Sequence, residues 1–362
     1  MDTFVVSNLL HRKTRTVLSI SGVALGVVLI VTTAGLINGF LHNQGNRNSA
    51  VSAEIMMRPM ATGFGVGFEV GALPSIPMAT VESVRSIEGV ADVVPIGQYL
   101  QGSQLIDGVD YESFIRVSRA RVIEGSPAVQ GDELMIDSTL KRIWNLKVGS
   151  TFEIFTRPFK VVGIYEPESL ARFKIPLATL QASANRPGMC SMLLVKVSEP
   201  ANQEEVALRI RDRLPDDRVM LTRDLPALFA RGTPALHSFM NVVIGLATVV
   251  STLVVLLTMY AAIIERTRQI GILKALGASK TWIAGQIEKE AVLISLLGIL
   301  SGFAISAVAG WAIEGLTPLR VDLEPAWFLY ALALSLMSGV FGSLYPALRA
   351  ANKDPVAALR YE

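Results

Sequence analysis

The sequence has 362 residues, of which 51% are hydrophobic and only 18% are charged, and its 33 basic and 31 acidic side chains leave a net charge of +2. Soluble globular domains carry about 25% charged residues, so the deficit indicates membrane-spanning segments, and the near-neutral balance excludes the concentrated basic field of a nucleic-acid-binding protein. Cys190 is the only cysteine and the three histidines are far apart in the sequence, which excludes an intrachain disulfide and argues against a metal site built on Cys or His.

Four stretches without Asp, Glu, Lys or Arg are long enough to cross a membrane as helices. A bilayer core about 30 Å thick needs roughly 20 apolar residues, and backbone groups in lipid must bond internally. The first stretch could instead be a cleaved signal peptide, because basic residues precede it, but its apolar run is longer than the ~7–15 residues of a signal sequence. We therefore predict uncleaved transmembrane helices at residues 17–40, 237–264, 291–313 and 326–348.

The Lys and Arg residues of the connecting segments indicate the orientation of these spans. Residues 1–16 hold three, residues 265–290 hold five and residues 349–362 hold three, whereas residues 314–325 hold only Arg320. Because cytoplasmic loops carry the excess of Lys and Arg, we expect an amphipathic N-terminal segment, the 265–290 loop and the C-terminal tail to be cytoplasmic. Residues 41–236 and the short loop 314–325 would then lie outside, in a multi-pass protein of the cell (inner) membrane.

Small residues recur at intervals of four inside the spans. They are Gly22 and Gly26 in the first span, Gly298, Gly302, Ser306 and Gly310 in the third, and Ser335, Gly339 and Ser343 in the fourth. Such stripes let helix backbones approach closely in lipid, either within one chain or between two copies. Because four helices are few for a transport path, we expect at least one stripe to be a dimer seam, with packing inside the chain as the alternative.

Residues 41–236 show the mixed patterns of an α+β domain. Alternating or β-branched runs predict strands, and apolar residues at helical spacing predict helices. The expected strands are residues 52–57, 91–95, 151–155, 159–164 and 193–197, and the expected helices are residues 80–86 and 203–214. Gly63, Gly65, Gly67 and Gly71 lack the dinucleotide-binding spacing and are interpreted as a mobile loop. Met56, Met57 and Met60 are interpreted as an adaptable apolar surface instead of soft metal ligands.

The segment after the second span predicts a short amphipathic helix at the membrane surface. Ile270, Leu273, Leu276 and Ile283 recur at near-helical spacing, and Gly277 is expected to end the helix. The alternative is a solvated basic loop that only fixes topology. The sequence from Gly277 to Thr281 resembles the end of a phosphate-binding loop, but Ser279 stands where that loop needs glycine, so we do not expect this chain to hydrolyse ATP.

Three segments carry a resemblance to a known family. The run from Glu265 to Ala278 resembles the signature of the FtsX/MacB-type ABC transporter permeases, also described as mechanotransmission or type VII transporters. Residues 8–15 and the tail 345–360 are similar to the corresponding parts of that family, and glycines at 125, 131, 149 and 163 match patterns of its MacB-like periplasmic domain. The resemblance covers nearly the whole chain and implies four transmembrane helices with an α+β extracytoplasmic domain between the first and second.

The family resemblance also implies the partners. A separate cytoplasmic ABC ATPase dimer would carry ATP and Mg, a second permease copy would complete the unit as a homodimer or heterodimer, and a periplasmic adaptor is left open. The chain itself would hold no cofactor and no metal. In this family the segment after the second span is the coupling helix that docks on the ATPase. The residues carried over to that role are Glu265, Arg266, Arg268, Gln269, Ile270, Gly271, Lys274, Gly277 and Ala278.

Two functions are therefore weighed for a chain that is not expected to be an enzyme by itself. The first is export or extraction of amphipathic or lipid-like cargo, such as a lipoprotein, glycolipid, peptide, hydrophobic drug or haem. The alternative is an FtsX-like signalling permease that activates a cell-wall hydrolase without transport. Ionisable residues usually mark a polar path through a membrane, so their absence from the spans argues against an ion or sugar route within the subunit.

Overall fold

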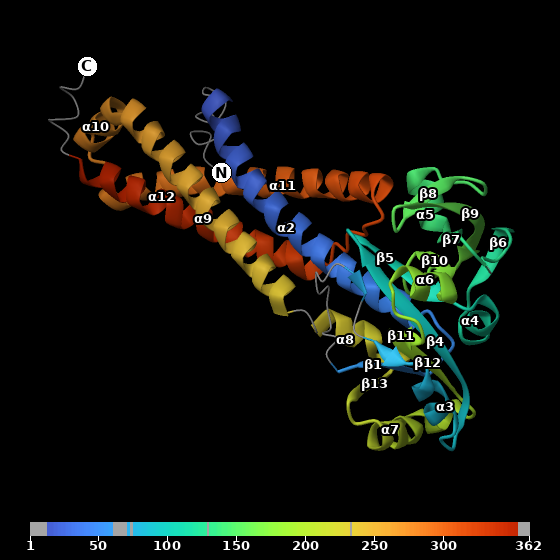
Figure 1. The fold of residues 1–362 in the computed structure, drawn as a ribbon. Helices are drawn as coiled ribbons and strands as arrows, with labels where there is room; N and C mark the ends of the chain where they lie inside the picture. Colours follow the sequence, from blue (N-terminus) through green and yellow to red (C-terminus); the bar gives the residue numbers. More distant parts are fainter. Residues whose placement is uncertain (1–12, 61–70, 73–74, 129, 232–233, 354–362) are drawn as a thin grey trace. The chain divides into compact units, whose positions relative to one another are not determined.

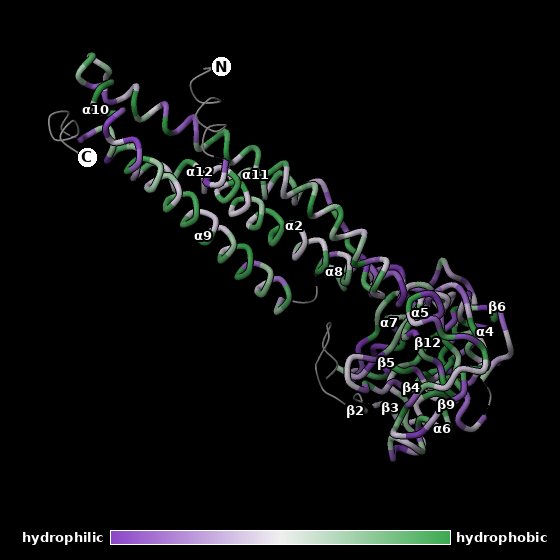
Figure 2. The backbone as a smooth tube through the Cα atoms, turned by 90° about the horizontal axis from the view of Figure 1, so that it is seen from above, coloured by the Kyte–Doolittle hydropathy of each residue, from purple (hydrophilic) through white to green (hydrophobic). Residues whose placement is uncertain are grey.

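The computed structural model describes residues 13–60, 71–72, 75–128, 130–231 and 234–353 (Figure 1). Four helices in this part of the chain are long and apolar enough to cross a membrane by length and composition. They are α2 (Lys13–Ser49), α9 (Pro234–Glu265), α11 (Lys280–Leu316) and α12 (Pro325–Asn352). These helices contain the four predicted spans, and Figure 2 shows mainly hydrophobic and neutral colours along them.

The chain divides into two compact units. The helical unit comprises residues 1–39, 235–315 and 319–362, and the inserted domain comprises residues 40–234 together with 316–318. Within the helical unit, half of the apolar window of α2 is buried, compared with 28–39% for the other three long helices. Val23, Val27 and Ile30 of α2 share one core with Val255 of α9 and Ile294 of α11. The first helix is therefore the central one of this unit.

The glycine stripes of the helical unit are explained by packing within the chain. A Cβ atom built on Gly298 would lie 2.6 Å from Val23 Cβ, and one built on Gly302 would lie 2.6 Å from Val27 Cβ, so only glycine lets α11 approach α2 this closely. Gly22, Gly26 and Gly339 are covered in the same way, by Val254, Ser251 and Ser295. A Cβ on Gly310 would make only an ordinary contact with Val321, and Ser306, Ser335 and Ser343 are buried.

These contacts change the expectation about dimerisation. The small-residue faces are occupied by helices of the same chain, because α2, α9, α11 and α12 use them to come together. The interpretation as packing within the chain therefore holds for the stripes. A dimer seam between two copies stays a prediction.

The inserted domain is built on one long mixed sheet. Its strands follow the order β13-β1-β12-β4-β5-β10-β7-β9-β6, in which β10 runs parallel to β5 and β7 parallel to β9. The bounds are β1 (Ile55–Pro59), β4 (Val90–Gln101), β5 (Gln104–Val109), β6 (Arg121–Gly125), β7 (Glu133–Asp137), β9 (Arg157–Glu166), β10 (Phe173–Pro176), β12 (Met192–Val197) and β13 (Asp217–Leu221). In the same sheet, β2 (Gly71–Ala72) pairs with β4 and β8 (Thr151–Ile154) pairs with β9, whereas β3 (Ile76–Pro77) and β11 (Met189–Cys190) form a separate two-stranded sheet.

Short helices cover the two halves of this sheet. In the half that contains β13, β1, β12 and β4, alternate residues face opposite sides, so Ile55 and Met57 pack under α3 (Ala79–Arg85) and α7 (Gln203–Arg213). Met56 points the other way, into a core shared with Phe114 of α4 (Tyr111–Val117). In the other half, α5 (Ser138–Trp144) and α6 (Leu177–Ser183) cover β5, β10, β7 and β9. α8 (Leu225–Arg231) follows the last strand.

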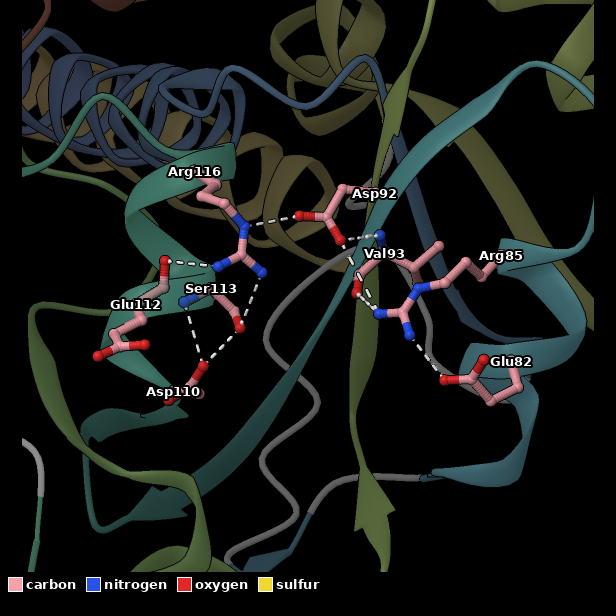
Figure 3. A network of polar contacts seen from close by, with 8 residues as sticks. All are labelled: Glu82, Arg85, Asp92, Val93, Asp110, Glu112, Ser113 and Arg116. Atoms are coloured by element: carbon pink, nitrogen blue, oxygen red, sulfur yellow. Dashed lines mark hydrogen bonds and ion pairs between the residues drawn. The ribbon is translucent and has the colours of Figure 1, made fainter.

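A surface network ties α3 and α4 to the start of β4 (Figure 3). Asp92 at that start accepts a bond from Arg116 Nε of α4 at 2.9 Å and lies 3.8 Å from Arg85 NH2 of α3. Asp110 caps α4 by accepting from the backbone N–H of Ser113 at 3.1 Å. The Asp92 carboxylate therefore links both α3 and α4 to the start of β4, the strand that both halves of the sheet share.

The structure confirms much of the predicted secondary structure of the inserted domain and corrects the rest. The predicted helices correspond to α3 and α7, and β8 and β9 form the predicted antiparallel hairpin. β4 is longer than expected and continues through Pro95 and Gly97, which break the apolar pattern without breaking the strand. Met56 and Met57 of β1, expected on an adaptable apolar surface, are instead buried in the core, and Met60 is 54% exposed. Gly63, Gly65 and Gly67, expected in a mobile loop, lie outside the described residues.

Candidate functional site

The segment after α9 folds into the short helix α10 (Thr267–Ala275), as predicted. Gly277 has a φ of +95°, a left-handed conformation that favours glycine. The backbone N–H of Ala278 donates to Leu273 O and that of Gly277 donates to Lys274 O, both at 3.0 Å, which is the hydrogen-bond pattern of a Schellman end. Gly277 therefore ends α10 and turns the chain toward α11.

α10 has one face against the helical unit and one face open. Thr267, Ile270 and Gly271 are buried, and Ile270 packs in a small core with Ile263, Ile283 and Ala350. The open face carries Arg268, Ile272 and Leu276, one turn apart, and Leu276 is 81% exposed. Within the chain, Ile270 is therefore buried and Leu276 is exposed, and the location of this helix at the membrane surface stays a prediction.

A buried ion-pair cluster fixes the start of α10. Arg266 donates from NH1 to Glu290 Oε2 at 2.9 Å and from NH2 to Glu290 Oε1 at 3.2 Å, a bidentate pair with a residue of α11. Arg15 of α2 donates to the same Glu290 Oε1 at 3.2 Å and to Glu265 Oε2 at 3.4 Å. The side chains of Arg15, Arg266 and Glu290 are 13%, 13% and 6% exposed, so this cluster is largely shielded from water.

The other end of α10 is tied to the end of α12. The Lys274 ammonium donates to the carbonyl oxygens of Ala351 at 2.9 Å and Lys353 at 2.5 Å, which satisfies acceptors at the C-terminus of α12. Lys353 in turn donates from Nζ to Thr267 Oγ1 at 2.9 Å. Together with the ion-pair cluster, these bonds link α10 to α2, α11 and α12, and the chain itself links it to α9.

This geometry sorts the predicted coupling residues into two groups. Arg268, Gln269 and Gly277 are exposed, and Glu265 is about half exposed. The others, Arg266, Ile270, Gly271, Lys274 and Ala278, are buried or half-buried among residues of the same chain. Arg266 and Lys274 are bound within the chain by Glu290 and by the end of α12, and their contact with acceptors on a partner stays a prediction.

A small apolar cavity of about 60 Å³ lies between α9, α10 and α11. Met259, Ile270, Trp282 and Ile287 are among its lining residues, and the Arg266–Glu290 pair borders it.

Sequence reasoning missed Arg15, Glu290 and Lys353 as parts of this site, because it counted the two basic residues only as topology signals. The signal that could have found Glu290 is its position: it is the last acid before the charge-free third span, in a loop dominated by Lys and Arg. An acid at the edge of the membrane that faces basic segments on the same side is expected to pair with them.

A second junction lies in the inserted domain, where α2 continues past the predicted span. Arg47 donates from NH1 to Leu170 O at 3.1 Å, and the Leu170 N–H donates to Arg47 O at 2.9 Å. Burial lowers the pKa of Arg47 to about 10, with Arg172 adding to the effect, so the guanidinium stays charged at neutral pH. Arg172 itself pairs with Asp137 at 2.6 Å. The loop between β9 and β10 is thus fastened to the end of α2.

Comparison with known proteins gives matches along the chain. The family model of the MacB-like periplasmic core domain matches residues 16–213, and the model of the FtsX-like permease C-terminal region matches residues 241–355. An uncharacterized ABC transporter permease of Bacillus subtilis, YknZ, is 23% identical over 99% of this chain and 98% of its own length. The macrolide export ATP-binding/permease protein MacB of Rhodospirillum rubrum is 25% identical over 96% of this chain.

The chain spans 58% of the length of that MacB relative. Among solved structures, the extracellular domain of the noncanonic ABC-type transporter YknZ from Gram-positive bacteria matches 46% of this chain with 14% identity and a TM-score of 0.34. The match to the MacB-like periplasmic core domain covers more than half of the chain, and the FtsX-like match follows it along the remaining helices. The chain therefore belongs to the MacB/FtsX-type ABC transporter permeases.

Proposed function

We propose that this permease transmits ATP-driven motion of a separate ATPase, through α10 and the long helices, to the inserted domain. The observation that carries the proposal is the two-sided character of α10. Its open face presents Arg268, Ile272 and Leu276, and its other side is tied to α2, α11 and α12 by hydrogen bonds and ion pairs. A helix built in this way can receive a push on one face and pass it on through the other.

The open face has the chemistry of a docking surface. Leu276 and Ile272 are 81% and 45% exposed, and Arg268 lies on the same side one turn earlier. Protein interfaces are enriched in Arg and in apolar anchors that fill pockets on the partner. The partner would therefore offer a groove with an apolar pocket for Leu276 and an acidic or carbonyl group for Arg268. ATP and Mg would be bound by that partner.

The contacts around α10 also support the proposed orientation. Arg15 from the N-terminal segment, Arg266 and Lys274 from the loop, and Lys353 from the tail take part in one set of contacts. These are the segments whose excess of Lys and Arg predicts a cytoplasmic location. We propose that both termini and α10 lie in the cytoplasm and that the inserted domain lies outside.

For cargo we propose an amphipathic or lipid-like molecule that is exported or extracted on the outer side by a pair of permease copies. The four spans carry no Asp, Glu, Lys or Arg, so no charged path crosses the subunit. The second candidate is a signalling permease that uses the same motion to activate a cell-wall hydrolase. A periplasmic adaptor is proposed only for the first candidate function, the export or extraction of cargo.

The docking proposal is tested by reversing the open face without touching the anchors. Arg268→Glu and Leu276→Asp should each weaken copurification of the ATPase that accompanies the tagged wild-type chain by about tenfold or more, the effect of losing an interface anchor. Arg320→Glu is the matched control, because it makes the same charge change in the loop between α11 and α12. Unchanged ATPase recovery with both α10 variants would refute the docking role.

Transport and signalling are separated by reconstitution of the full chain with its ATPase in proteoliposomes. ATP-dependent extraction of a fluorescent lipopeptide or glycolipid from the membrane supports the first candidate. ATP-dependent recruitment of a peptidoglycan hydrolase, with no amphiphile released, supports the second.

A further inference from the structure

Glu290, the residue just before the predicted third span, is shared by two arginines from distant parts of the chain. Its Oε1 accepts from Arg15 NH2 and from Arg266 NH2, both at 3.2 Å, and its Oε2 accepts from Arg266 NH1 at 2.9 Å. Arg15 lies in the first turn of α2, and Arg266 stands immediately before α10. The Glu290 carboxylate therefore joins the start of α2 to the start of α10, which is called the docking helix below.

Burial holds the contacts between Glu290 and the two arginines in place. Glu290 is 6% exposed and the two arginines are 13% exposed each, so water cannot easily replace either partner. The bond from Arg266 NH1, at 2.9 Å, has the length of a charge-assisted hydrogen bond, and the bidentate guanidinium makes the contact directional. The second bond of Arg15, to the half-exposed Glu265, is longer at 3.4 Å. Glu290 is thus the main acceptor for both cations.

The helix that receives this contact also contributes its last turns to the inserted domain. α2 runs without interruption from Lys13 to Ser49, and its last turns belong to the inserted domain, where Arg47 and Leu170 exchange hydrogen bonds. Arg15 and Arg47 are about nine helical turns apart on this one helix. A displacement of α10 that moves Arg266 would move Glu290 and Arg15 with it.

We propose that Glu290 is the positioning residue that makes α2 follow α10, so that motion received by the docking helix reaches the inserted domain. This inference rests on the proposed function, since it needs an ATPase that moves α10. It differs from a role in docking, because Glu290 lies on the anchored side, away from Arg268 and Leu276. Its removal is expected to separate ATPase binding from movement of the inserted domain.

The test uses the full permease and its copurifying ATPase in nanodiscs. A spin label is placed at Ser103→Cys, at the exposed turn between β4 and β5, in a chain whose own Cys190 is buried. The change in the distance between the labels of two copies on trapping the ATPase with a non-hydrolysable nucleotide reports motion of the inserted domain. Glu290→Gln is compared with Glu288→Gln, a matched control on the same helix whose carboxylate bonds to Ser343 of α12 at 2.8 Å.

The expected result is that Glu290→Gln, in the complexes that retain bound ATPase, loses most of the nucleotide-dependent distance change. Glu288→Gln should keep it. Arg15→Gln should have the same effect as Glu290→Gln, and the double variant should be no worse, because the residues act as one unit.

Two results would overturn the inference. One is a full distance change in Glu290→Gln. The other is loss of ATPase binding in Glu290→Gln together with normal binding in Glu288→Gln, which would make Glu290 a residue that only shapes the docking face. A wild-type complex that shows no nucleotide-dependent change at all would instead contradict the proposed function.

Discussion

The buried pair of Lys174 and Asp107 gives the sharpest prediction about stability of the inserted domain. Both side chains are 0% exposed, and Lys174 Nζ donates to Asp107 Oδ2 at 2.7 Å, to Ser169 O at 2.8 Å and to Ala171 O at 2.7 Å. Asp107 also accepts from Gln98 Nε2 at 2.8 Å. Lys174→Met would keep the volume of the side chain and remove every one of the ammonium contacts.

The expected cost follows from what Lys174→Met leaves behind. Removing one partner of a buried ion pair strands the other charge and costs about 3–5 kcal/mol. Asp107 keeps two N–H donors, from Gln98 and Ala171, so the cost should fall at the lower end, near about 3 kcal/mol. Asp107→Asn added to Lys174→Met removes the stranded charge, and the double variant should regain about half of the loss.

The assay is chemical unfolding of the full chain in detergent, followed by the fluorescence of Trp144. This residue lies in the inserted domain, with its ring centroid 5.8 Å from that of Phe173, next to Lys174. Replacing the other three tryptophans, Trp282, Trp311 and Trp327, by Phe makes the signal specific. A loss below about 1 kcal/mol in Lys174→Met, or no recovery in the double variant, would refute the assigned role of the pair.

Three further predictions concern the helices, the cysteine and the outer junction. Gly298→Ala should lower the free energy of unfolding by about 1–3 kcal/mol, because the added methyl would meet α2. Gly245→Ala is the control and should be neutral or stabilising, because a Cβ there would have nothing within 4 Å. Equal effects of the two substitutions on the free energy of unfolding would contradict the packing argument. Burial raises the pKa of Cys190 to about 12, so only about one thiol in ten thousand is ionised at pH 8, and maleimide labelling should require unfolding; rapid labelling of the native protein would disprove this. Arg47→Met should speed amide exchange in residues 168–172 about fivefold by mass spectrometry, because the Leu170 carbonyl loses its donor, and unchanged exchange would exclude that anchor.

Features that depend on composition and local pattern were predictable from the sequence. Four charge-free runs about 20 residues long have no stable alternative to membrane helices, and Gly277 ends α10 because the left-handed turn there is a local requirement. The hairpin of β8 and β9 and the helix α7 follow from their periodicity in the same way. The signature around α10 was sufficient to indicate the family.

Features that depend on which segments meet in space were not predictable. Ile270 and Leu276 look equivalent in the sequence, yet one is buried and the other is 81% exposed, because α10 rests on the ends of other helices and not on lipid alone. The crossing of β4 between two halves of the sheet and the parallel pairing of β5 with β10 need contacts across more than 60 residues.

The sequence by itself determined that this protein has four apolar segments long enough to span a membrane, that it carries an α+β domain between the first two of them and that a basic segment follows the second. Hydrophobic length, charge asymmetry and turn chemistry are properties of the local chain, so they can be read without coordinates. Only the tertiary structure decided that the glycine stripes pack within the chain and that Arg266 and Lys274 are anchors. It also showed that Glu290 joins α2 to α10, because a charge gains a partner only when folding brings residues 275 positions apart into contact.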